Sequence, residues 1–263
     1  MKVGVIGALG KMGREIVNAV LAESDLDFVC AVDLNLKGED IGAIINNKPC
    51  GVLIENDLDK ALETSKPDVV IDFTQPNSAF NNAKTILEAG ARPVIGTTGL
   101  KDNEIEELKE LSKKLNISGI IAPNFTTGAV LMMMFEKIAA KYFDNAEIIE
   151  LHHNQKKDAP SGTAVKTAQM MAEVNSDMAK GNCAETELIK GSRGGKSYSN
   201  IQIHSVRMPG FIASQEVILG ASGQVLSIRH DSMDRTCYMA GVLMAVRYAY
   251  DNKQFVYGLD NIL

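Results

Sequence analysis

The chain has 263 residues, of which 45% are hydrophobic and 23% are charged, and its net charge is −6. This composition is typical of a globular protein with a sizeable core, and the negative charge argues against a general affinity for nucleic acid or for anionic membranes. The four cysteines are widely spaced and form no CxxC pair, so we expect no metal site and no disulfide framework, and we expect a reducing, cytoplasmic location.

The first half of the chain alternates predicted strands with predicted helices. Short apolar runs predict strands at 2–7, 27–33, 68–74, 92–96 and 117–123. Segments with helical spacing or helix-start signals predict helices at 11–22, 76–89 and 102–115. Because such alternation produces βαβ units, we expect an α/β domain with a Rossmann-type, doubly wound parallel sheet. No apolar run reaches the length of a membrane span.

The pattern changes from about residue 124 onward. Strands are predicted at 146–153, 199–208, 211–220 and 223–231. One helix at 162–174 interrupts them, 190–197 is predicted as a flexible basic loop, and 232–250 is predicted as a final helix. Consecutive strands joined by short glycine-containing turns favour an antiparallel or mixed sheet, so we expect a second, α+β domain.

The first glycine cluster, GALGKMG, places Gly7, Gly10 and Gly13 between a predicted strand and a predicted helix. Glycines at this junction permit a tight turn and let the backbone approach a pyrophosphate at the helix N-terminus. Asp33 ends the next strand and could accept hydrogen bonds from the adenosine ribose. The pattern therefore predicts a dinucleotide site, although a glycine-rich structural turn of another doubly wound fold has the same spacing.

The choice of dinucleotide depends on the residues around Asp33. Its carboxylate would repel a 2′-phosphate, which favours NADH, and no arginine follows it. Lys11 and Lys37 could still tolerate NADPH. Two further loops, GTTG at 96–99 and APNF at 122–125, follow predicted strands, at the strand ends where open α/β sheets bind ligands. The alternative is that both loops are only connectors.

The segment ELHHNQKKDAPSGTA, at 150–164, combines a possible base, a cation and a helix start. His152 and His153 are adjacent on a predicted strand and so face opposite ways, whereas Lys156 could reach the side of His152 if the chain stays extended. Ser161 is a good N-cap, and the N–H groups of residues 162 and 163 could bind a carboxylate. Taken singly, each feature has a structural alternative: a buried histidine, a solvated lysine or a plain helix cap.

The longer segment EIIELHHNQKKDAPSGTA, at 147–164, resembles the signature of the 4-hydroxy-tetrahydrodipicolinate reductase family, long called dihydrodipicolinate reductase. GALGKMG, DFT (72–74), GTTG, NF (124–125) and RHDSMDR (229–235) are also similar and occur in the expected order. The resemblance covers essentially the whole chain. It implies reduction of 4-hydroxy-tetrahydrodipicolinate with loss of water, by NADH or NADPH, in diaminopimelate and lysine biosynthesis.

The resemblance also implies residue roles and an organisation. Catalysis falls to His152 and Lys156, and substrate binding to His153, Gly162 and Thr163. The implied cofactor contacts are Gly7, Ala8, Leu9, Gly10, Lys11, Met12, Asp33, Gly96, Thr97, Thr98, Ala122, Pro123, Asn124 and Phe125. A dinucleotide-binding domain of residues 1–123 plus 241–263 would accompany a substrate-binding and oligomerisation domain of residues 124–240, and members usually form homotetramers.

Three sites depart from the family pattern. The chain has Ala213-Ser214-Gln215 where members often carry Gly-Glu-His, Asn154-Gln155 after the histidine pair where Arg-His is common, and Gln75 where Arg or His is familiar. Two other functions therefore stay open: another nicotinamide-dependent dehydrogenase of the same two-domain plan, or a non-catalytic dinucleotide sensor.

Overall fold

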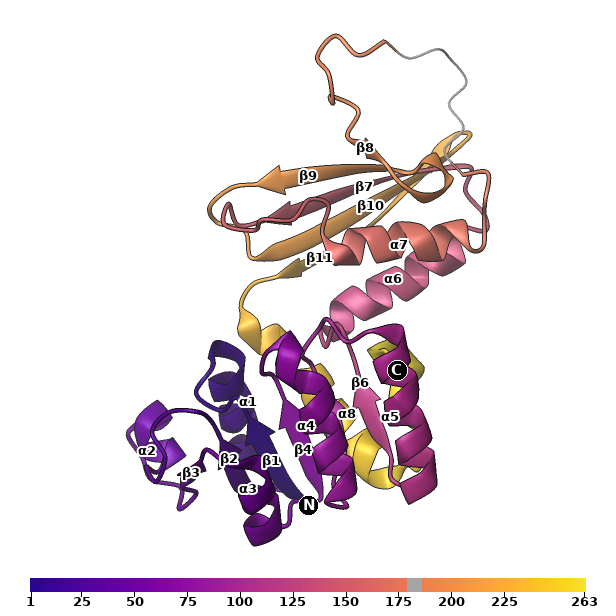
Figure 1. Cartoon of the computed structure of the whole chain (residues 1–263). Coiled ribbons are helices and arrows are strands. Elements are labelled where there is room, and N and C mark those ends of the chain that lie inside the picture. Colours follow the sequence, from indigo (N-terminus) through magenta and orange to yellow (C-terminus); the bar gives the residue numbers. More distant parts are fainter. Residues whose placement is uncertain (179–185) are drawn as a thin grey trace. The chain divides into compact units, whose positions relative to one another are not determined.

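The chain folds into two compact units in a computed structural model that describes residues 1–178 and 186–263 (Figure 1). Cys183 therefore lies outside the described residues. Unit 1 comprises Met1–Thr127 and Tyr238–Leu263, and unit 2 comprises Gly128–Cys237. The sequence-based boundaries follow residues 123 and 240, whereas the structure changes unit after residues 127 and 237.

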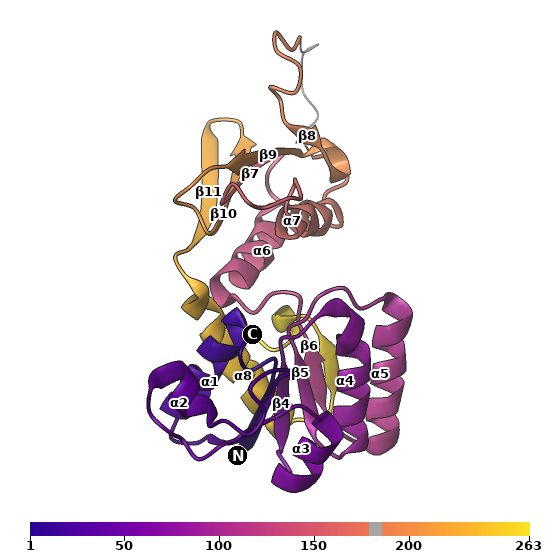
Figure 2. The same cartoon turned by 60° about the vertical axis from the view of Figure 1, so that its left-hand side comes forward.

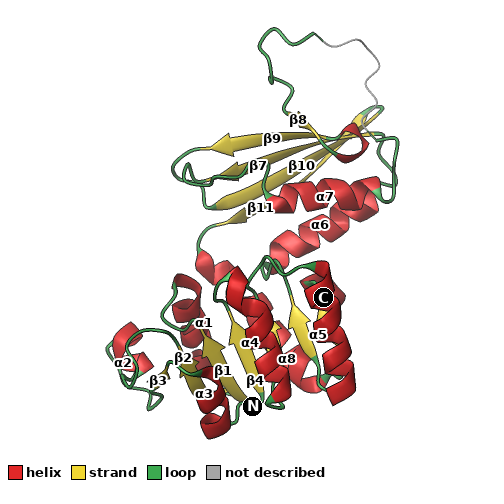
Figure 3. Cartoon of the chain, in the orientation of Figure 1, coloured by secondary structure: helices red, strands yellow, loops and turns green. Residues whose placement is uncertain are grey.

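Unit 1 is built on a seven-stranded sheet of order β12-β6-β5-β4-β1-β2-β3, in which all pairings are parallel (Figure 3). The strands are β1 Lys2–Ile6, β2 Asp27–Val32, β3 Ile54–Glu55, β4 Val69–Asp72, β5 Arg92–Ile95, β6 Gly119–Ile121 and β12 Phe255–Tyr257. The order reverses direction between β1 and β4, which is where doubly wound sheets bind ligands. The predicted Rossmann-type sheet is confirmed.

Helices cover both faces of this sheet, so its central strands β1, β4, β5 and β6 are apolar and largely buried (Figures 1 and 2). One face carries α1 Lys11–Ala22 and α8 Met239–Asp251, which contact each other. The other carries α3 Leu58–Ser65, α4 Pro76–Glu88 and α5 Asp102–Leu115, and α2 Ile41–Asn46 lies near the β3 edge. All four residues of β4 are buried, which places the carboxyl end of the central strands on a rigid core.

Unit 2 has a mixed five-stranded sheet of order β11-β10-β7-β9-β8. Its strands are β7 Asn145–His152, β8 Gly195–Lys196, β9 Gln202–Arg207, β10 Ala213–Ala221 and β11 Gln224–Ser232. Only β7 and β9 pair in parallel. Two helices, α6 Thr127–Ala139 and α7 Gly162–Ala172, lie on one face of the sheet, over a core that includes Ile148, Met171 and Val217 (Figures 1 and 2).

The structure corrects several local predictions. Helix α6 is missing from the sequence-based assignment because TGAVLMMMFEKIA is apolar on most of its surface and gives only a weak helical period. The elements α2, β3, α3 and β12 are too short to show a clear pattern. The segment expected to be a loop at 190–197 contains β8, and the final helix begins at Met239, after a 3-10 helix, η2 Arg235–Tyr238. A 3-10 helix, η1 Tyr198–Asn200, likewise occupies the start of the predicted strand 199–208, and another, η3 Leu259–Asn261, follows β12.

Candidate functional site

The glycine loop of unit 1 has the geometry of a phosphate-binding turn. Gly7 has a φ of +75°, and a side chain there would also press on the Phe73 carbonyl. A Cβ on Gly13 would lie 2.0 Å from the Gly7 carbonyl oxygen, so only glycine allows α1 to start this close to β1. Among the described residues, no acceptor meets the backbone N–H of Lys11, Met12 or Gly13. These donors at the start of α1 fit the pyrophosphate of a dinucleotide.

Asp33 lies at the end of β2 beside this loop. Its Oδ2 accepts the Leu9 N–H at 2.9 Å and its Oδ1 accepts the Asn35 N–H at 3.3 Å. A cavity of about 520 Å³ is lined by Gly7, Gly10 and Asp33, together with Asn56 and Gln75 from later loops. The remaining lone pairs of the carboxylate could receive ribose hydroxyls there. The sequence offered no signal for Asn56, and Gln75 stood out only as a departure from the family.

A buried carboxylate, that of Asp72, organises the loops that follow β4 and β5. Asp72 is fully buried, and its Oδ1 accepts the Thr74 N–H at 2.8 Å, the Thr74 hydroxyl at 2.7 Å and the Thr97 hydroxyl at 3.0 Å. Its Oδ2 accepts the Asn82 side-chain N–H at 2.8 Å. The loop Gly96–Thr98 is thereby tied to the loop that lines the cavity.

Phe73 packs against the loop at 122–125, the remaining loop that the sequence predicted as a cofactor contact. A Cβ on Gly96 would lie 2.1 Å from the Phe73 ring, and the rings of Phe73 and Phe125 are 5.6 Å apart. The loops that follow β1, β4, β5 and β6 therefore meet at the carboxyl end of the sheet. Thr97, Ala122 and Phe125 are buried, whereas Thr98, Pro123 and Asn124 are half-buried or exposed. Ala8 is also buried, while the backbone of Leu9 contacts Asp33.

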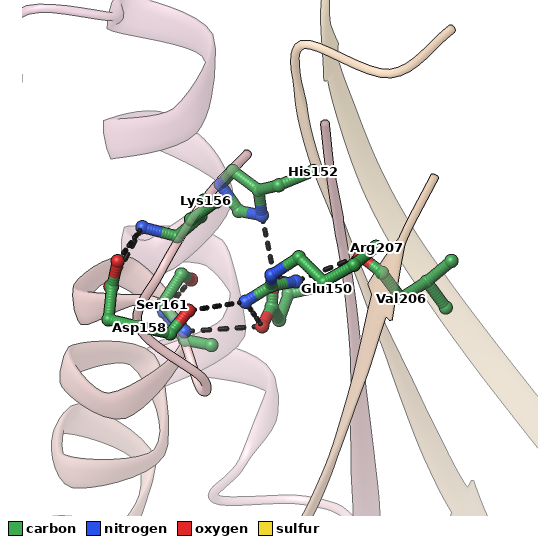
Figure 4. Close-up of polar contacts among 8 residues, drawn as sticks. Glu150, His152, Lys156, Asp158, Ser161, Val206 and Arg207 are labelled. Carbon is green, nitrogen blue, oxygen red and sulfur yellow. Dashed lines mark hydrogen bonds and ion pairs between the residues drawn. The ribbon is translucent and has the colours of Figure 1, made fainter. Parts of the chain in front are cut away.

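In unit 2, His152 is the last residue of β7 and is tied to a buried carboxylate, that of Glu150 (Figure 4). The His152 Nδ1 lies 2.5 Å from Glu150 Oε2, and Arg207 binds both oxygens of the same carboxylate, at 2.8 and 2.7 Å. Burial lowers the pKa of His152, the Glu150 carboxylate opposes this, and the charges of Lys156 and Arg207 lower the pKa further. The imidazole is therefore neutral at pH 7.

Lys156 reaches this site through a turn rather than through an extended chain. Its N–H donates to the His153 carbonyl at 3.1 Å, so the chain does not stay extended as far as Lys156. The Lys156 ammonium pairs with both oxygens of Asp158, at 2.8 and 2.7 Å, and this pair holds the pKa of Asp158 below its usual range. Its charge also acts on His152. His153 is exposed.

The predicted helix start is present. Ser161 caps α7, because its hydroxyl accepts the Ala164 N–H at 3.2 Å. The N–H groups of Gly162 and Thr163 meet no acceptor among the described residues, and open space lies where a Cβ on Gly162 would be. Two unpaired donors at a helix N-terminus suit a carboxylate.

Sequence reasoning missed Glu150 and Arg207. A signal existed for Glu150, since it lies two residues before His152 and so on the same face of β7. No local signal existed for Arg207, which comes from β9 and meets His152 through the parallel register. No group of three or more His, Cys, Asp or Glu side chains in residues 1–178 and 186–263 could hold a metal ion. Over the same residues, no helix is both long and apolar enough to cross a bilayer.

A doubly wound unit with a phosphate-binding turn, joined to a sheet-rich unit that carries titratable groups, is the plan of nicotinamide dinucleotide-dependent oxidoreductases. The fold recurs at low identity: the amine dehydrogenase from Mycobacterium smegmatis has a TM-score of 0.72 at 14% identity, over 100% of this chain and 96% of that one. This likeness concerns the fold alone.

Two family models identify the particular family. "Dihydrodipicolinate reductase, N-terminus" matches residues 1–125, and "Dihydrodipicolinate reductase, C-terminus" matches residues 128–263. The chain belongs to the dihydrodipicolinate reductase family, as the 147–164 signature predicted, and it is an NAD(P)H-dependent oxidoreductase.

Individual relatives match this chain over 98–100% of their own length. The 4-hydroxy-tetrahydrodipicolinate reductase of Listeria innocua serovar 6a is 51% identical over 263 residues, 100% of both chains. That of Syntrophomonas wolfei is 49% identical over 262 residues, 100% of this chain and 98% of that protein. The dipicolinate-bound dihydrodipicolinate reductase from Paenisporosarcina sp. TG-14 has a TM-score of 0.91 at 42% identity, over 100% of this chain and 99% of that one.

Proposed function

We propose that this chain reduces 4-hydroxy-2,3,4,5-tetrahydrodipicolinate to tetrahydrodipicolinate with loss of water, using NADH or NADPH, in diaminopimelate and lysine biosynthesis. The observation that carries the proposal is the segment from His152 to Thr163. It combines a neutral imidazole, an ammonium and two unpaired helix-start N–H groups. Full-length relatives named for this reaction, about half identical to the chain, support it.

The roles of the residues follow from their charge states. When bound, the reduced nicotinamide supplies the hydride. Lys156 donates the proton, because its ammonium is held by Asp158 at the turn beside His152, and it stabilises negative charge on the ring. His152 is neutral and carries its proton on Nδ1, so its Nε2 accepts a hydrogen bond or a proton.

The substrate is a dicarboxylate, and the same segment offers two places for its charges. The N–H groups of Gly162 and Thr163 bind one carboxylate at the start of α7. Lys156 and the exposed His153 lie nearby in sequence to bind the other. A relative from Paenisporosarcina is dipicolinate-bound, which supports a ligand with two carboxylates.

For the cofactor, NADH is the favoured dinucleotide. Asp33 keeps a carboxylate beside the cavity of unit 1, where it would bind ribose hydroxyls and repel a 2′-phosphate. The glycine turn, Gly96–Thr98 and Ala122–Phe125 would contribute the other contacts. Calorimetric titration with each dinucleotide tests the preference: tighter binding of NADPH would contradict it.

The chain is further proposed to act in the cytoplasm as a homotetramer. Cys30 and Cys50 carry free thiols, as expected in a reducing compartment. The sheet face of unit 2 opposite α6 and α7 carries half-buried Ile149 and Leu151 and exposes Val225, so it could pack against other copies. Light scattering after gel filtration should give the mass of four chains, and a monomeric mass would contradict this assembly.

Ala213-Ser214-Gln215, which departs from the family pattern, gives little support to the alternative function of a non-catalytic dinucleotide sensor. Gln215 is buried in unit 2, where its side-chain N–H donates to the Thr167 hydroxyl of α7 at 2.8 Å. Its role is therefore to join β10 to α7 within the core. A sensor also has no use for the proton-handling groups at residues 152 and 156.

The decisive test is turnover. The purified full chain is mixed with the condensation product of pyruvate and aspartate semialdehyde and with NADH or NADPH, and the loss of cofactor absorbance is followed. Substrate-dependent oxidation is expected, and a reaction without the condensation product controls for background oxidation. No turnover with either cofactor would end the proposal in favour of another dehydrogenase or a sensor.

A further inference from the structure

Glu150 is the point at which three elements of unit 2 meet. Its side chain is fully buried at the inner face of β7, with Ala146 and Ile148 on the same face. Its Oε2 faces His152 Nδ1 at 2.5 Å and Arg207 Nη1 at 2.8 Å. Its Oε1 accepts Arg207 Nη2 at 2.7 Å and the Ser161 N–H at 3.2 Å. His152 of β7, Arg207 of β9 and the start of α7 therefore converge on one carboxylate (Figure 4).

The carboxylate stays ionised although it is buried. Burial alone would raise the pKa of Glu150, but hydrogen bonds from Arg207, Ser205 and His152 hold it below its usual range. The Arg207 guanidinium supplies the compensating positive charge through a bidentate pair with the Glu150 carboxylate. An ionised carboxylate has no proton to donate, so Glu150 acts only as an acceptor.

This acceptor decides which nitrogen of His152 carries the proton. A neutral imidazole has one N–H, and a hydrogen bond from Nδ1 to a carboxylate fixes that proton on Nδ1. The lone pair is then on Nε2, in a side chain that is 15% accessible. Without the carboxylate, both tautomers become available and the ring can rotate.

The same carboxylate also fixes the anion site. The Ser161 N–H bonded to Oε1 belongs to the N-cap residue of α7, directly before Gly162 and Thr163. Arg207 adds a second tie, because its Nη2 also donates to the Asp158 carbonyl at 2.8 Å. The turn that carries Lys156 is therefore anchored at both ends to a single ion pair.

We propose that Glu150 is a positioning residue for the reaction: it holds His152 as the Nδ1–H tautomer and sets the start of α7 relative to that ring. The inference rests on the proposed function, and it adds a residue that acts through His152 and α7 without touching the substrate. The expected effect falls on kcat and on the KM for the dicarboxylate, while the KM for the cofactor, bound by unit 1, stays unchanged.

The chain supplies a matched control on the same strand. Glu147 faces the opposite side of β7 and binds an arginine and a histidine as well, Arg193 Nη2 at 2.6 Å and His204 Nε2 at 2.7 Å. Its side chain is 37% exposed. Glu147→Gln removes a carboxylate that pairs with an arginine and a histidine on the other face of β7.

The test compares Glu150→Gln with Glu147→Gln by steady-state kinetics and by ¹⁵N NMR of the histidine side chains, with His152→Gln used to assign the signal. In the wild type, neutral His152 should carry its proton on Nδ1. Glu150→Gln should lose this preference and lower kcat about 10- to 10⁴-fold, the range seen when a residue that orients a functional histidine is removed. Glu147→Gln should keep the tautomer and keep kcat within about twofold, with its assembly state checked by gel filtration.

Two outcomes would overturn the inference. One is a wild-type His152 that carries its proton on Nε2. The other is a folded Glu150→Gln variant with unchanged tautomer and kcat. A wild-type chain without reductase turnover would instead contradict the proposed function, and the NMR measurement would still decide the tautomer.

Discussion

Two glutamates of unit 2 have equally inaccessible side chains, and yet their pKa values are shifted in opposite directions. Glu150 and Glu136 both have 0% exposure. Glu150 accepts hydrogen bonds from Arg207 and Ser161 and faces His152 Nδ1, and its pKa lies below its usual range. Neither oxygen of Glu136, on α6, has a partner among the described residues, and burial raises its pKa to about 9. The donors that fold around a carboxylate, and not its burial alone, therefore decide whether it is charged.

The difference in pKa distinguishes Glu150, at the candidate site, from Glu136, in the core. Glu150 can orient a catalytic base because it is ionised at neutral pH. Glu136 is a neutral carboxylic acid at that pH and contributes to packing at the cost of leaving its polar atoms unpaired.

Arg207→Ala should have the largest effect, because it would leave Glu150 buried without its cation. We expect a loss of about 3–5 kcal/mol in the free energy of unfolding at pH 8. The loss should be smaller at pH 5, where a proton can replace the guanidinium. Urea unfolding at both pH values measures it.

Arg193→Ala is the control for this substitution. Arg193 pairs with Glu147 on the opposite face of β7, where both side chains are more than a third exposed, so we expect a loss of about 1 kcal/mol or less. Equal losses for the two variants would mean that the buried pair is no stronger than the exposed one.

Glu136→Gln should change how stability depends on pH. Between the unfolded pKa, near 4.5, and the folded pKa of about 9, the folded chain retains the Glu136 proton and the unfolded chain releases it. The folded state therefore loses about 1.4 kcal/mol of stability per pH unit as pH rises through this window. The amide cannot titrate, so the variant should lack this slope.

The measurement is the free energy of unfolding at several pH values for both chains. Glu110→Gln, which removes an exposed carboxylate from α5, should keep the wild-type slope. Parallel pH profiles for wild type and Glu136→Gln would show that Glu136 is ionised in the fold.

Lys137→Ala should have the smallest effect, although Lys137 is the next residue along α6. Its ammonium pairs with Glu173 at 2.8 Å, with 39% and 44% of the two side chains exposed. Solvent screens such pairs, so we expect a change of about 0.5 kcal/mol or less. A loss comparable to that of Arg207→Ala would break the distinction between buried and exposed pairs.

The sequence predicted the glycine turn, Asp33 and the α7 start because each depends on local spacing. Gly7 and Gly13 are set by the contact between β1 and α1, and Ser161 by the capping of a helix that begins one residue later. Such features need few neighbours, so they can be recognised before the fold is known.

The centre of the unit 2 site could not be predicted in the same way. Arg207 is 57 residues from Glu150, and only the parallel pairing of β7 with β9 brings them together. The turn that places Lys156 depends on the His153 carbonyl. The state of Glu136 depends on the packing of α6, a helix whose apolar sequence hides its buried face.

The most direct test of the account compares Lys156→Ala with Lys157→Ala in the turnover assay. The two lysines are adjacent, but only Lys156 is half-buried beside His152, whereas Lys157 is exposed. If Lys156 donates the proton, its substitution should lower kcat about 100-fold or more, while Lys157→Ala should stay within about twofold of wild type. A near-normal kcat for Lys156→Ala would contradict the assignment of the reaction to this site.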